Sequence, residues 1–199
     1  MDITQILLSQ LGDGGVEAMA NKIGANKKQT ASALEGIVPT LLGAMSSNTK
    51  SENGASGLLG ALDRDHDGSI LDDVAGFIGN SDDGPGEGIL KHVLGNNRDT
   101  VENGLSAKTG LNSSQIGQLL KMAAPLIMGY LGKQKKQQGS GFDLGSIAGL
   151  LGGMANTSDK NTGLDLGDIL NVVGGLSGNT GAAQKGGGIG GLLGKLFGK

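Results

Sequence analysis

An acidic segment, residues 63–73, carries the side chains of this chain that are best suited to chemistry. It reads DRDHDGSILDD, so aspartates occupy positions 1, 3 and 5 of an EF-hand-like loop, glycine position 6 and serine position 7. A loop around a hard cation directs alternate side chains inward, and glycine makes the sharp bend that follows. The sequence therefore predicts one calcium site, with these ligands: Asp63, Asp65, Asp67, Ser69 through its backbone carbonyl, Asp72 and Asp73.

The closing half of this loop departs from the EF-hand pattern. Position 12 is Val74, which cannot supply the usual bidentate carboxylate, although Asp72 and Asp73 at positions 10 and 11 could reach the ion. The departure indicates a weak site, with a dissociation constant on the order of 10⁻⁴ M. The alternative is a solvated turn in which these two aspartates complement the positive end of the next helix.

Other patterns that could support chemistry are weaker. The segment 158–168 keeps some acidic and amide residues but not the full ligand series, so we interpret it as a decayed or unrelated loop. His66 and His92 are the only histidines, and neither belongs to an HExxH pattern. No GxSxG or Walker segment occurs, and the GxGxxG at residues 186–191 is too near the end of the sequence to open a dinucleotide-binding fold. We therefore expect no catalytic activity and no organic cofactor.

A repeat organises the elements around this loop. An offset of 86 residues places Lys22–Met45 over Lys108–Leu131, and the residues that recur are those that end and start helices. Glycine suits the left-handed position after a helix, and asparagine followed three residues later by glutamine suits the start of the next. Each copy thus predicts a helix, a tight turn and a longer helix. The recurring pairs are Gly24 and Gly110, Asn26 and Asn112, and Gln29 and Gln115.

Both longer helices carry apolar residues at spacings of three and four, which places those residues on one face. Each also contains an internal proline, Pro39 or Pro125, which predicts a kink. Strand-like alternation is absent from the sequence. We therefore predict an all-α, internally duplicated helical bundle of short helices with kinked longer helices and one EF-hand-like loop. The shorter predicted helices are Thr4–Leu11, Gly57–Leu62, Leu71–Ile78, Glu87–Leu94, Leu144–Met154, Leu166–Val173 and Ile189–Phe197.

Stretches rich in glycine, serine and charge divide the chain. The predicted linkers are residues 46–54, 79–88, 133–141 and 177–188. The predicted domains are a first helical repeat with the calcium-type loop at 1–84, a second helical repeat at 85–176 and a flexible Gly-rich tail at 177–199.

The composition limits both the core and the long-range field. Glycine supplies 40 of the 199 residues and aromatic residues only 2%, so Leu, Ile, Val, Ala and Met must build the core. The formal net charge of −3 gives no field that attracts nucleic acid or an anionic membrane. No signal peptide and no run of about 20 apolar residues occurs. We therefore expect a cytoplasmic location by default. A calcium site this weak would be mostly empty in a cytosol, so an extracytoplasmic location stays open.

The favoured function is a non-enzymatic helical structural or interaction protein that binds calcium weakly. Its expected partner is another protein or a second copy of the chain. The units around Gly24 and Gly110 also resemble DNA-binding helix-turn-helix motifs, but their phosphate-neutralising charge is sparse, so nucleic acid is not favoured. The Gly-Leu-rich segment 188–199 could support self-association or weak docking on a membrane surface, with only two lysines to assist.

Three segments together resemble a known family: ALDRDHDGSILDDVAGFIG at 61–79, KTGLNSSQIGQLLKMAAPLIMGYLG at 108–132 and GGLLGKLFGK at 190–199. The family is an uncharacterised bacterial one, a domain of unknown function (DUF937). The resemblance implies a helical protein of bacterial origin. It supplies no established activity, substrate or catalytic residue, so the functional expectations rest on the residues themselves.

Overall fold

The computed structural model describes residues 3–64, 68–80, 84–138 and 149, and these residues form helices and turns without a strand. The prediction of an all-α fold is confirmed. The elements, with η for short 3₁₀ helices, are α1 (Ile3–Ile23), α2 (Lys27–Asn48), α3 (Glu52–Arg64), η1 (Ser69–Leu71), α4 (Val74–Asn80), α5 (Gly84–Val93), η2 (Gly95–Asn97), α6 (Arg98–Thr109) and α7 (Ser113–Gln138).

The two tight turns, from α1 to α2 and from α6 to α7, have the predicted chemistry. Gly24 and Gly110 adopt left-handed conformations, with φ values of 67° and 72°. In the first turn the Asn26 side chain accepts a hydrogen bond from the backbone N–H of Gln29, and the Gln29 side chain accepts one from the backbone N–H of Asn26. The second turn repeats both bonds, at 2.9 and 3.0 Å, between the corresponding asparagine and glutamine. These capping boxes fix where each long helix begins.

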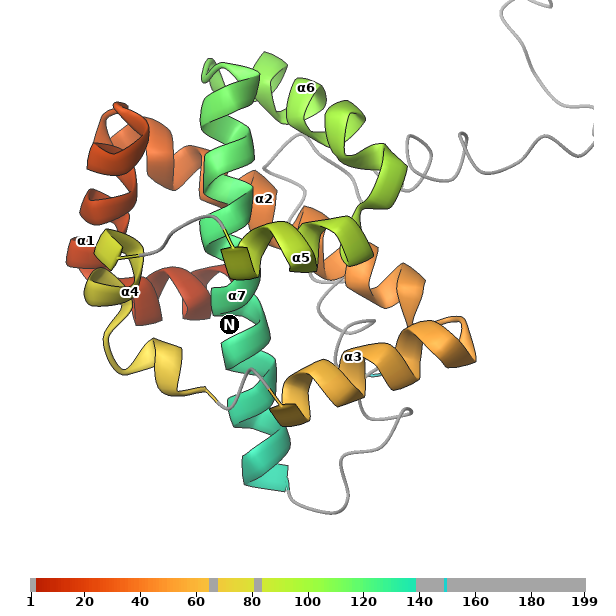
Figure 1. The fold of residues 1–199 in the computed structure, drawn as a ribbon. Coiled ribbons are helices and arrows are strands. Elements are labelled where there is room, and N and C mark those ends of the chain that lie inside the picture. The colour runs from red at the N-terminus through yellow and green to blue at the C-terminus, as the bar shows by residue number, and fades with distance from the viewer. Residues whose placement is uncertain (1–2, 65–67, 81–83, 139–148, 150–199) are drawn as a thin grey trace, which may run out of the picture.

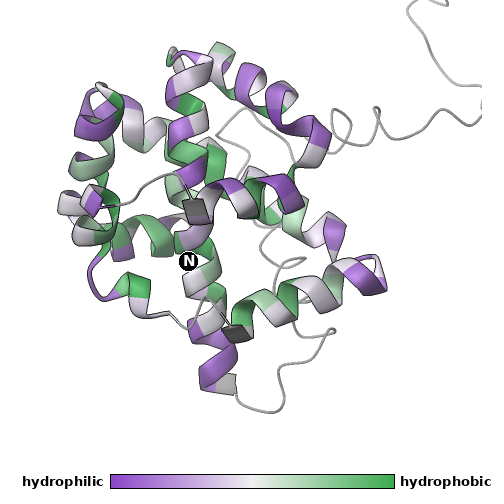
Figure 2. Ribbon diagram, in the orientation of Figure 1, coloured by the Kyte–Doolittle hydropathy of each residue, from purple (hydrophilic) through white to green (hydrophobic). Residues whose placement is uncertain are grey.

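The long helices α2 and α7 form the centre of the molecule. In Figure 1, α7 runs through the middle, with α1 and α4 on one side and α3, α5 and α6 on the other. The seven consecutive residues from Met122 to Met128 are all buried, so the middle of α7 is covered on every side. Neither α2 nor α7 ends at its proline, Pro39 or Pro125. The apolar faces of the surrounding helices turn inward and their hydrophilic faces outward (Figure 2).

One hydrophobic cluster joins helices from before and after residue 84. It contains residues of α1, α2 and α4 together with residues of α5, α6 and α7. Its largest fully buried side chains are Met, Leu and Ile, whereas Phe77 and Tyr130 are only partly buried at its edge. Among the described residues the core therefore contains no fully buried aromatic ring, as the composition implies. The proposed division at residue 84 stays a prediction, and the described helices on its two sides share this core.

Two glycines let elements dock directly on the backbone of α7. A Cβ atom at Gly86 of α5 would collide with the backbone carbonyl of Lys121. A Cβ atom at Gly129 of α7 would collide with the Ile70 side chain of η1. These contacts place α5 and η1 closer to α7 than larger residues would allow.

Three predicted linkers are largely helical. Within 79–88, the described residues belong to the end of α4 and the start of α5. Within 46–54, α2 continues to Asn48 and α3 begins at Glu52, where the Ser51 hydroxyl accepts a hydrogen bond from the backbone N–H of Gly54 at 3.1 Å. Within 133–141, α7 continues to Gln138. Lysine and glutamine have high helix propensity, and the lysines complement the negative end of the helix dipole. Composition alone therefore misplaced the helix boundaries in all three segments.

The start of the chain agrees with the predicted helix Thr4–Leu11. The element α1 spans Ile3–Ile23 but consists of two helical segments that meet at a kink, because Gly12 has a non-helical conformation (φ 58°, ψ 179°); the first segment therefore ends at Leu11, as predicted. The helices predicted at 144–154, 166–173 and 189–197, and the tail at 177–199, lie outside the described residues, apart from Gly149.

Candidate functional site

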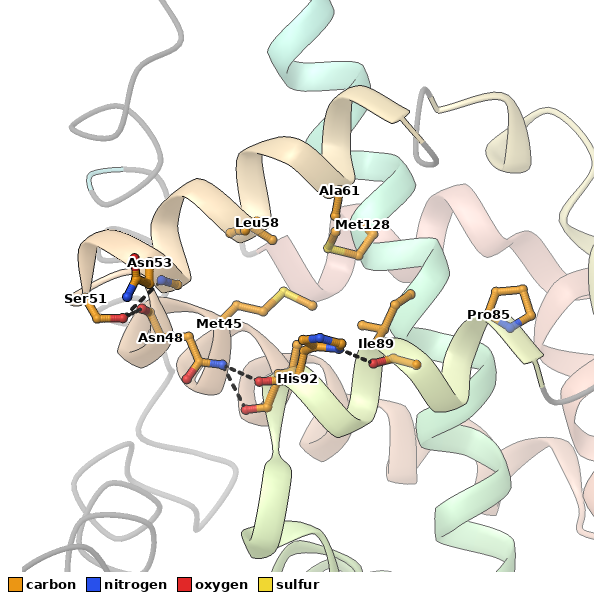
Figure 3. Close-up of a pocket in the computed structure, with 14 residues that line it drawn as sticks. Met45, Asn48, Ser51, Asn53, Leu58, Ala61, Pro85, Ile89, His92 and Met128 are labelled. Atoms are coloured by element: carbon orange, nitrogen blue, oxygen red, sulfur yellow. Dashed lines mark hydrogen bonds between the residues drawn. The ribbon is translucent and has the colours of Figure 1, made fainter.

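A groove between α3 and α5 has the dimensions of a ligand-binding site. Its volume is about 790 Å³, and the C-terminal end of α2 and the middle of α7 contribute to its floor (Figure 3). Met45 of α2 and Met128 of α7 lie at the floor, with Leu58 and Ala61 of α3 on one wall and Ile89 and Val93 of α5 on the other. Asn48, Ser51, Asn53 and His92 supply polar atoms at one end.

The polar groups at this end of the groove bind the ends of the surrounding helices. The Asn48 side chain donates hydrogen bonds to the backbone carbonyls of His92 and Val93, at 3.0 and 3.1 Å. It thereby joins the last turn of α2 to the last turn of α5. The hydroxyl of Ser51 donates to the backbone carbonyl of Asn48 at 3.1 Å and caps the start of α3. These side chains therefore position the walls.

The groove itself is apolar and nearly uncharged. Met45 and Met128 are 1% and 2% exposed, and Leu58 and Ile89 are half-buried. Methionine side chains are flexible and polarisable, so such a floor can adapt to different apolar surfaces. His92 is the single titratable side chain in the lining, and its Nδ1 lies 2.8 Å from the backbone carbonyl of Gly88. No carboxylate or nucleophile paired with a base faces the groove among the described lining residues.

Ion pairs behind α5 hold this wall in place. Glu87 pairs with Arg98 of α6 and, at 3.3 Å, with Lys121 of α7, and Arg98 also pairs with Glu102 at 2.7 Å. The hydrogen bond from Arg98 lowers the pKa of Glu87, and the two carboxylates raise the pKa of Arg98. Together with the close contact at Gly86, these pairs fix α5 against α6 and α7.

The structure describes only part of the predicted calcium loop. Asp63 lies in the last turn of α3, while Asp65 and Asp67 lie outside the described residues. Gly68 has a left-handed conformation with φ of 93°, which is the bend that the pattern predicts at position 6. Ser69 begins η1 and is exposed.

Asp72 and Asp73 close the loop in different ways. Asp72 is exposed, whereas Oδ1 of Asp73 accepts a hydrogen bond from the backbone N–H of Gly76 at 2.8 Å and so caps α4. This contact matches the alternative in which the aspartates serve the start of the next helix. Within the described ranges, no three acidic, histidine or cysteine side chains cluster as a metal site would require.

Lys133, near the end of α7, lies beside this loop. The sequence did not indicate this proximity. A Cβ atom on Gly68 would lie 3.0 Å from Cβ of Lys133 and 3.3 Å from the carbonyl oxygen of Gly129. The sequence offered only Arg64 and His66 as nearby positive groups. The fold thus brings the stem of a lysine next to the acidic segment, close to the bend at Gly68.

The two helix-turn-helix units pack against each other. Nε2 of Gln115 donates to the backbone carbonyl of Ile23 at 3.0 Å, which joins the two turns. Lys27 pairs with the exposed Asp13 at 2.6 Å, and this lysine lowers the pKa of the carboxyl. The would-be recognition helices are α2 and α7. From Met122 to Met128 α7 is buried on all sides, whereas α2 keeps exposed residues such as Glu35 opposite its buried face. The covered part of α7 cannot enter a major groove, so the packing does not favour the paired use of both helices on DNA.

The chain belongs to a family of bacterial proteins of unknown function (DUF937), whose family model matches residues 5–134. The match ends within α7 and covers both turns, the groove and the acidic segment. No curated protein and no solved structure matches the chain. Within the described residues, no helix is long and apolar enough to cross a bilayer.

The sequence did not identify the groove residues as a site. His92 was expected on a helix surface, and the methionines were expected in the core. Asn48 and Ser51 could have pointed to the groove. They lie between two apolar helical segments, and polar side chains there indicate a helix end whose free backbone groups need hydrogen-bond partners from another element.

Proposed function

We propose that this protein is a non-catalytic interaction protein whose α3–α5 groove binds the apolar face of a helix. The observation that supports this function most is the apolar, nearly uncharged lining of a groove of about 790 Å³. Ligand pockets typically measure about 300 to 1,000 Å³, and an amphipathic helix inserts a few apolar side chains into such a groove. The methionine floor suits this mode because it adapts to the inserted side chain.

The same lining argues against catalysis at this site. General acid–base or nucleophilic chemistry needs a base within hydrogen-bond reach of the group that it activates. Here the Ser51 hydroxyl is bonded to the end of α2, and His92 is bonded within its own helix. The polar atoms of the groove therefore support helix ends and leave the apolar walls for binding.

Labelled helical peptides test this proposal by fluorescence anisotropy. The probes are an amphipathic helix with leucines at helical spacing and two peptides from this chain, residues 145–154 and 188–199. We expect micromolar binding of at least one probe, and Ile89→Glu should weaken it by about tenfold or more, because a carboxylate would be buried on the wall. Ala75→Glu, on the exposed side of α4, is the matched control.

The outcome of this experiment distinguishes self-association from binding of a separate partner. Binding of a peptide from the chain itself supports self-association, and binding of the leucine probe alone supports a separate partner. Equal weakening by Ile89→Glu and Ala75→Glu, or no binding of any probe, would contradict the groove as a docking site.

A second candidate function is weak calcium binding by the acidic loop. The observation that favours it is the left-handed conformation of Gly68, at the loop position where an EF-hand requires a sharp bend. The loop lies between the last turn of α3 and the capped start of α4, so a bound ion would join these two helices. The proposed ligands are Asp63, Asp65, Asp67, Ser69 and Asp72, with Asp73 retained as the helix cap.

Calcium titration by calorimetry and thermal unfolding tests this second function. Wild type should show heat and a higher melting temperature at millimolar calcium, and Asp65→Ala and Asp67→Ala should remove both effects. At about tenfold excess over the dissociation constant, the added stability is about 1.4 kcal/mol. If Lys133 shares the neutralisation of the loop, Lys133→Met should strengthen calcium binding. Absence of both heat and a melting shift in wild type would exclude the site.

A further inference from the structure

The floor of the α3–α5 groove is suited to an aromatic ring. Met45 of α2 and Met128 of α7 both line the groove, and their sulfur atoms lie between its two walls (Figure 3). A thioether sulfur makes favourable contacts with aromatic rings at a distance of about 5 Å, often at the ring edge. Two such sulfurs side by side therefore favour an aromatic side chain over an aliphatic one of similar size.

Small residues form part of both walls and leave room for a wide side chain. Gly57 and Ala61 belong to α3, and Gly88 belongs to α5. A Cβ atom on Gly57 or on Gly88 would meet no neighbouring element of the described residues within 4 Å. A planar bicyclic ring can therefore pass between the walls and reach the methionines.

His92 presents a hydrogen-bond acceptor in the same groove. Its Nδ1 lies 2.8 Å from the backbone carbonyl oxygen of Gly88. Because a carbonyl oxygen can only accept, Nδ1 carries the proton of the neutral imidazole and donates it to this bond. The other ring nitrogen, Nε2, is then unprotonated and can accept a hydrogen bond from a ligand.

Tryptophan is the side chain that matches both the floor and the acceptor. It combines a large bicyclic aromatic surface with an indole N–H that donates hydrogen bonds and cannot accept them. The chain itself contains no tryptophan, so a second copy cannot supply this group. The features of the groove therefore favour a different protein as the partner.

We propose that the groove binds a tryptophan-bearing helix of another protein, with the indole ring on Met45 and Met128 and its N–H donated to Nε2 of His92. This proposal rests on the function proposed above, the docking of an apolar helix face, and adds the side chain that anchors the helix. The walls α3 and α5 contain 13 and 10 residues. They are therefore about 20 and 15 Å long, enough to contact about three turns of the partner helix.

Synthetic peptides of about 15 residues test the anchoring side chain, since shorter isolated helices are only marginally stable. They share one amphipathic sequence and differ at the central apolar position, which is leucine, tryptophan or benzothienylalanine. In benzothienylalanine a sulfur atom replaces the indole N–H, so the ring keeps its shape and loses its donor. Fluorescence anisotropy of a dye on each peptide measures the dissociation constant with the full chain, at about pH 8 to favour the neutral imidazole.

We expect the tryptophan peptide to bind about tenfold more tightly than the leucine peptide, and about threefold more tightly than the benzothienylalanine peptide. Because the chain has no tryptophan, the indole emission of the mixture comes from the peptide alone. This emission should shift to shorter wavelength when the ring becomes buried in the groove.

Protein variants separate the hydrogen bond from the ring contact. His92→Phe keeps a ring without an acceptor, so the tryptophan and benzothienylalanine peptides should bind it equally. Gly57→Leu fills the space between the walls and should weaken binding of the tryptophan peptide by about tenfold or more. Gly104→Leu is the matched control, because this glycine of α6 is also exposed with nothing within 4 Å of its Cβ position. Circular dichroism confirms that each variant keeps its helix content.

The peptide series distinguishes this proposal from the docking function on which it rests. Binding of the leucine peptide with equal or weaker binding of the tryptophan peptide would overturn the tryptophan anchor and leave the groove as a docking site. No binding of any peptide would overturn both. A preference for tryptophan over benzothienylalanine that persists in His92→Phe would overturn the hydrogen bond to His92.

Discussion

At the residue scale, Asp73 has a structural role that limits its role in metal binding. Its Oδ1 accepts the backbone N–H of Gly76 and caps α4, while the neighbouring Asp72 is exposed. A carboxylate that caps a helix satisfies one of the free N–H groups of the first turn and interacts favourably with the helix dipole. In the absence of an ion, Asp73 is therefore expected to contribute more than Asp72 to the free energy of unfolding.

We predict that Asp73→Ala lowers the free energy of unfolding by about 1 kcal/mol, the usual effect of losing an N-cap. Asp72→Ala should change it by less than about 0.5 kcal/mol, because an exposed side chain without a cap contributes little. Urea denaturation in the presence of EDTA measures both values. Equal losses for the two variants would show that the cap does not stabilise α4.

Glu87 gives a pH-dependent contribution through its pairs with Arg98 and Lys121. The hydrogen bond from Arg98 lowers its folded-state pKa below the ordinary value of 4.5. The contribution is therefore complete above that value and is lost as the pH falls through the lower folded-state pKa. Because the Glu87 side chain is 48% exposed, solvent screening keeps the contribution below about 1 kcal/mol.

We expect Glu87→Gln to be less stable than wild type at about pH 7 and nearly equal to it at a pH below the lowered folded-state pKa of Glu87, where both chains lack the carboxylate. Urea denaturation at the two pH values measures the difference. Glu35→Gln, an exposed carboxylate on α2, serves as the control for a general change in charge. A constant difference between Glu87→Gln and wild type across this range would rule out the ion pair as its cause.

At the element scale, η1 docks on α7 through Gly129. A Cβ atom there would collide with the Ile70 side chain, so the glycine sets how closely the loop segment approaches the central helix. Overpacking of a closely packed contact typically costs about 1 to 3 kcal/mol. Replacing a helical glycine that has no neighbouring atoms near its Cβ position should instead stabilise the helix, because alanine has the higher helix propensity.

Gly129→Ala should therefore destabilise the protein by about 1 to 3 kcal/mol, and Gly14→Ala, with nothing within 4 Å of its Cβ position, should stabilise it by up to about 1 kcal/mol. Adding Ile70→Ala to Gly129→Ala should recover part of the loss by relieving the collision. Chemical denaturation of the four chains, including wild type, measures these differences. No recovery in the double variant would place the cause elsewhere in α7.

The elements that the sequence predicted well are those fixed by neighbouring residues. Glycine, asparagine and glutamine set both tight turns, because their hydrogen bonds connect residues only three apart. The groove could not be predicted in this way, since Met45, Leu58, Ile89 and Met128 come from four helices whose approach depends on packing. The proximity of Lys133 to Gly68 was hidden for the same reason. Composition also failed at the end of α7, where polar residues continue the helix to Gln138.

At the scale of the whole molecule, α3 connects the two candidate functions. One wall of the groove is formed by its residues Leu58 and Ala61, and its last turn contains Asp63 of the acidic loop. The opposite wall, α5, is fixed by ion pairs and by its close contact with α7. An ion bound in the loop would join the end of α3 to α4 and so reduce the freedom of the less fixed wall.

Calcium should therefore strengthen peptide binding in the groove. The coupling free energy between two sites is typically about 1 to 3 kcal/mol. Because this loop is small, we expect a value at the lower limit, which corresponds to about fivefold tighter binding of the peptide. Fluorescence anisotropy with the helical peptide, at millimolar calcium and with EDTA, measures the ratio of the two dissociation constants. Asp67→Ala should abolish the difference while leaving the affinity in EDTA unchanged. Because coupling is reciprocal, saturating peptide should raise the calcium affinity by the same factor. A calcium effect on peptide binding without this shift in calcium affinity would exclude α3 as the link between the two sites.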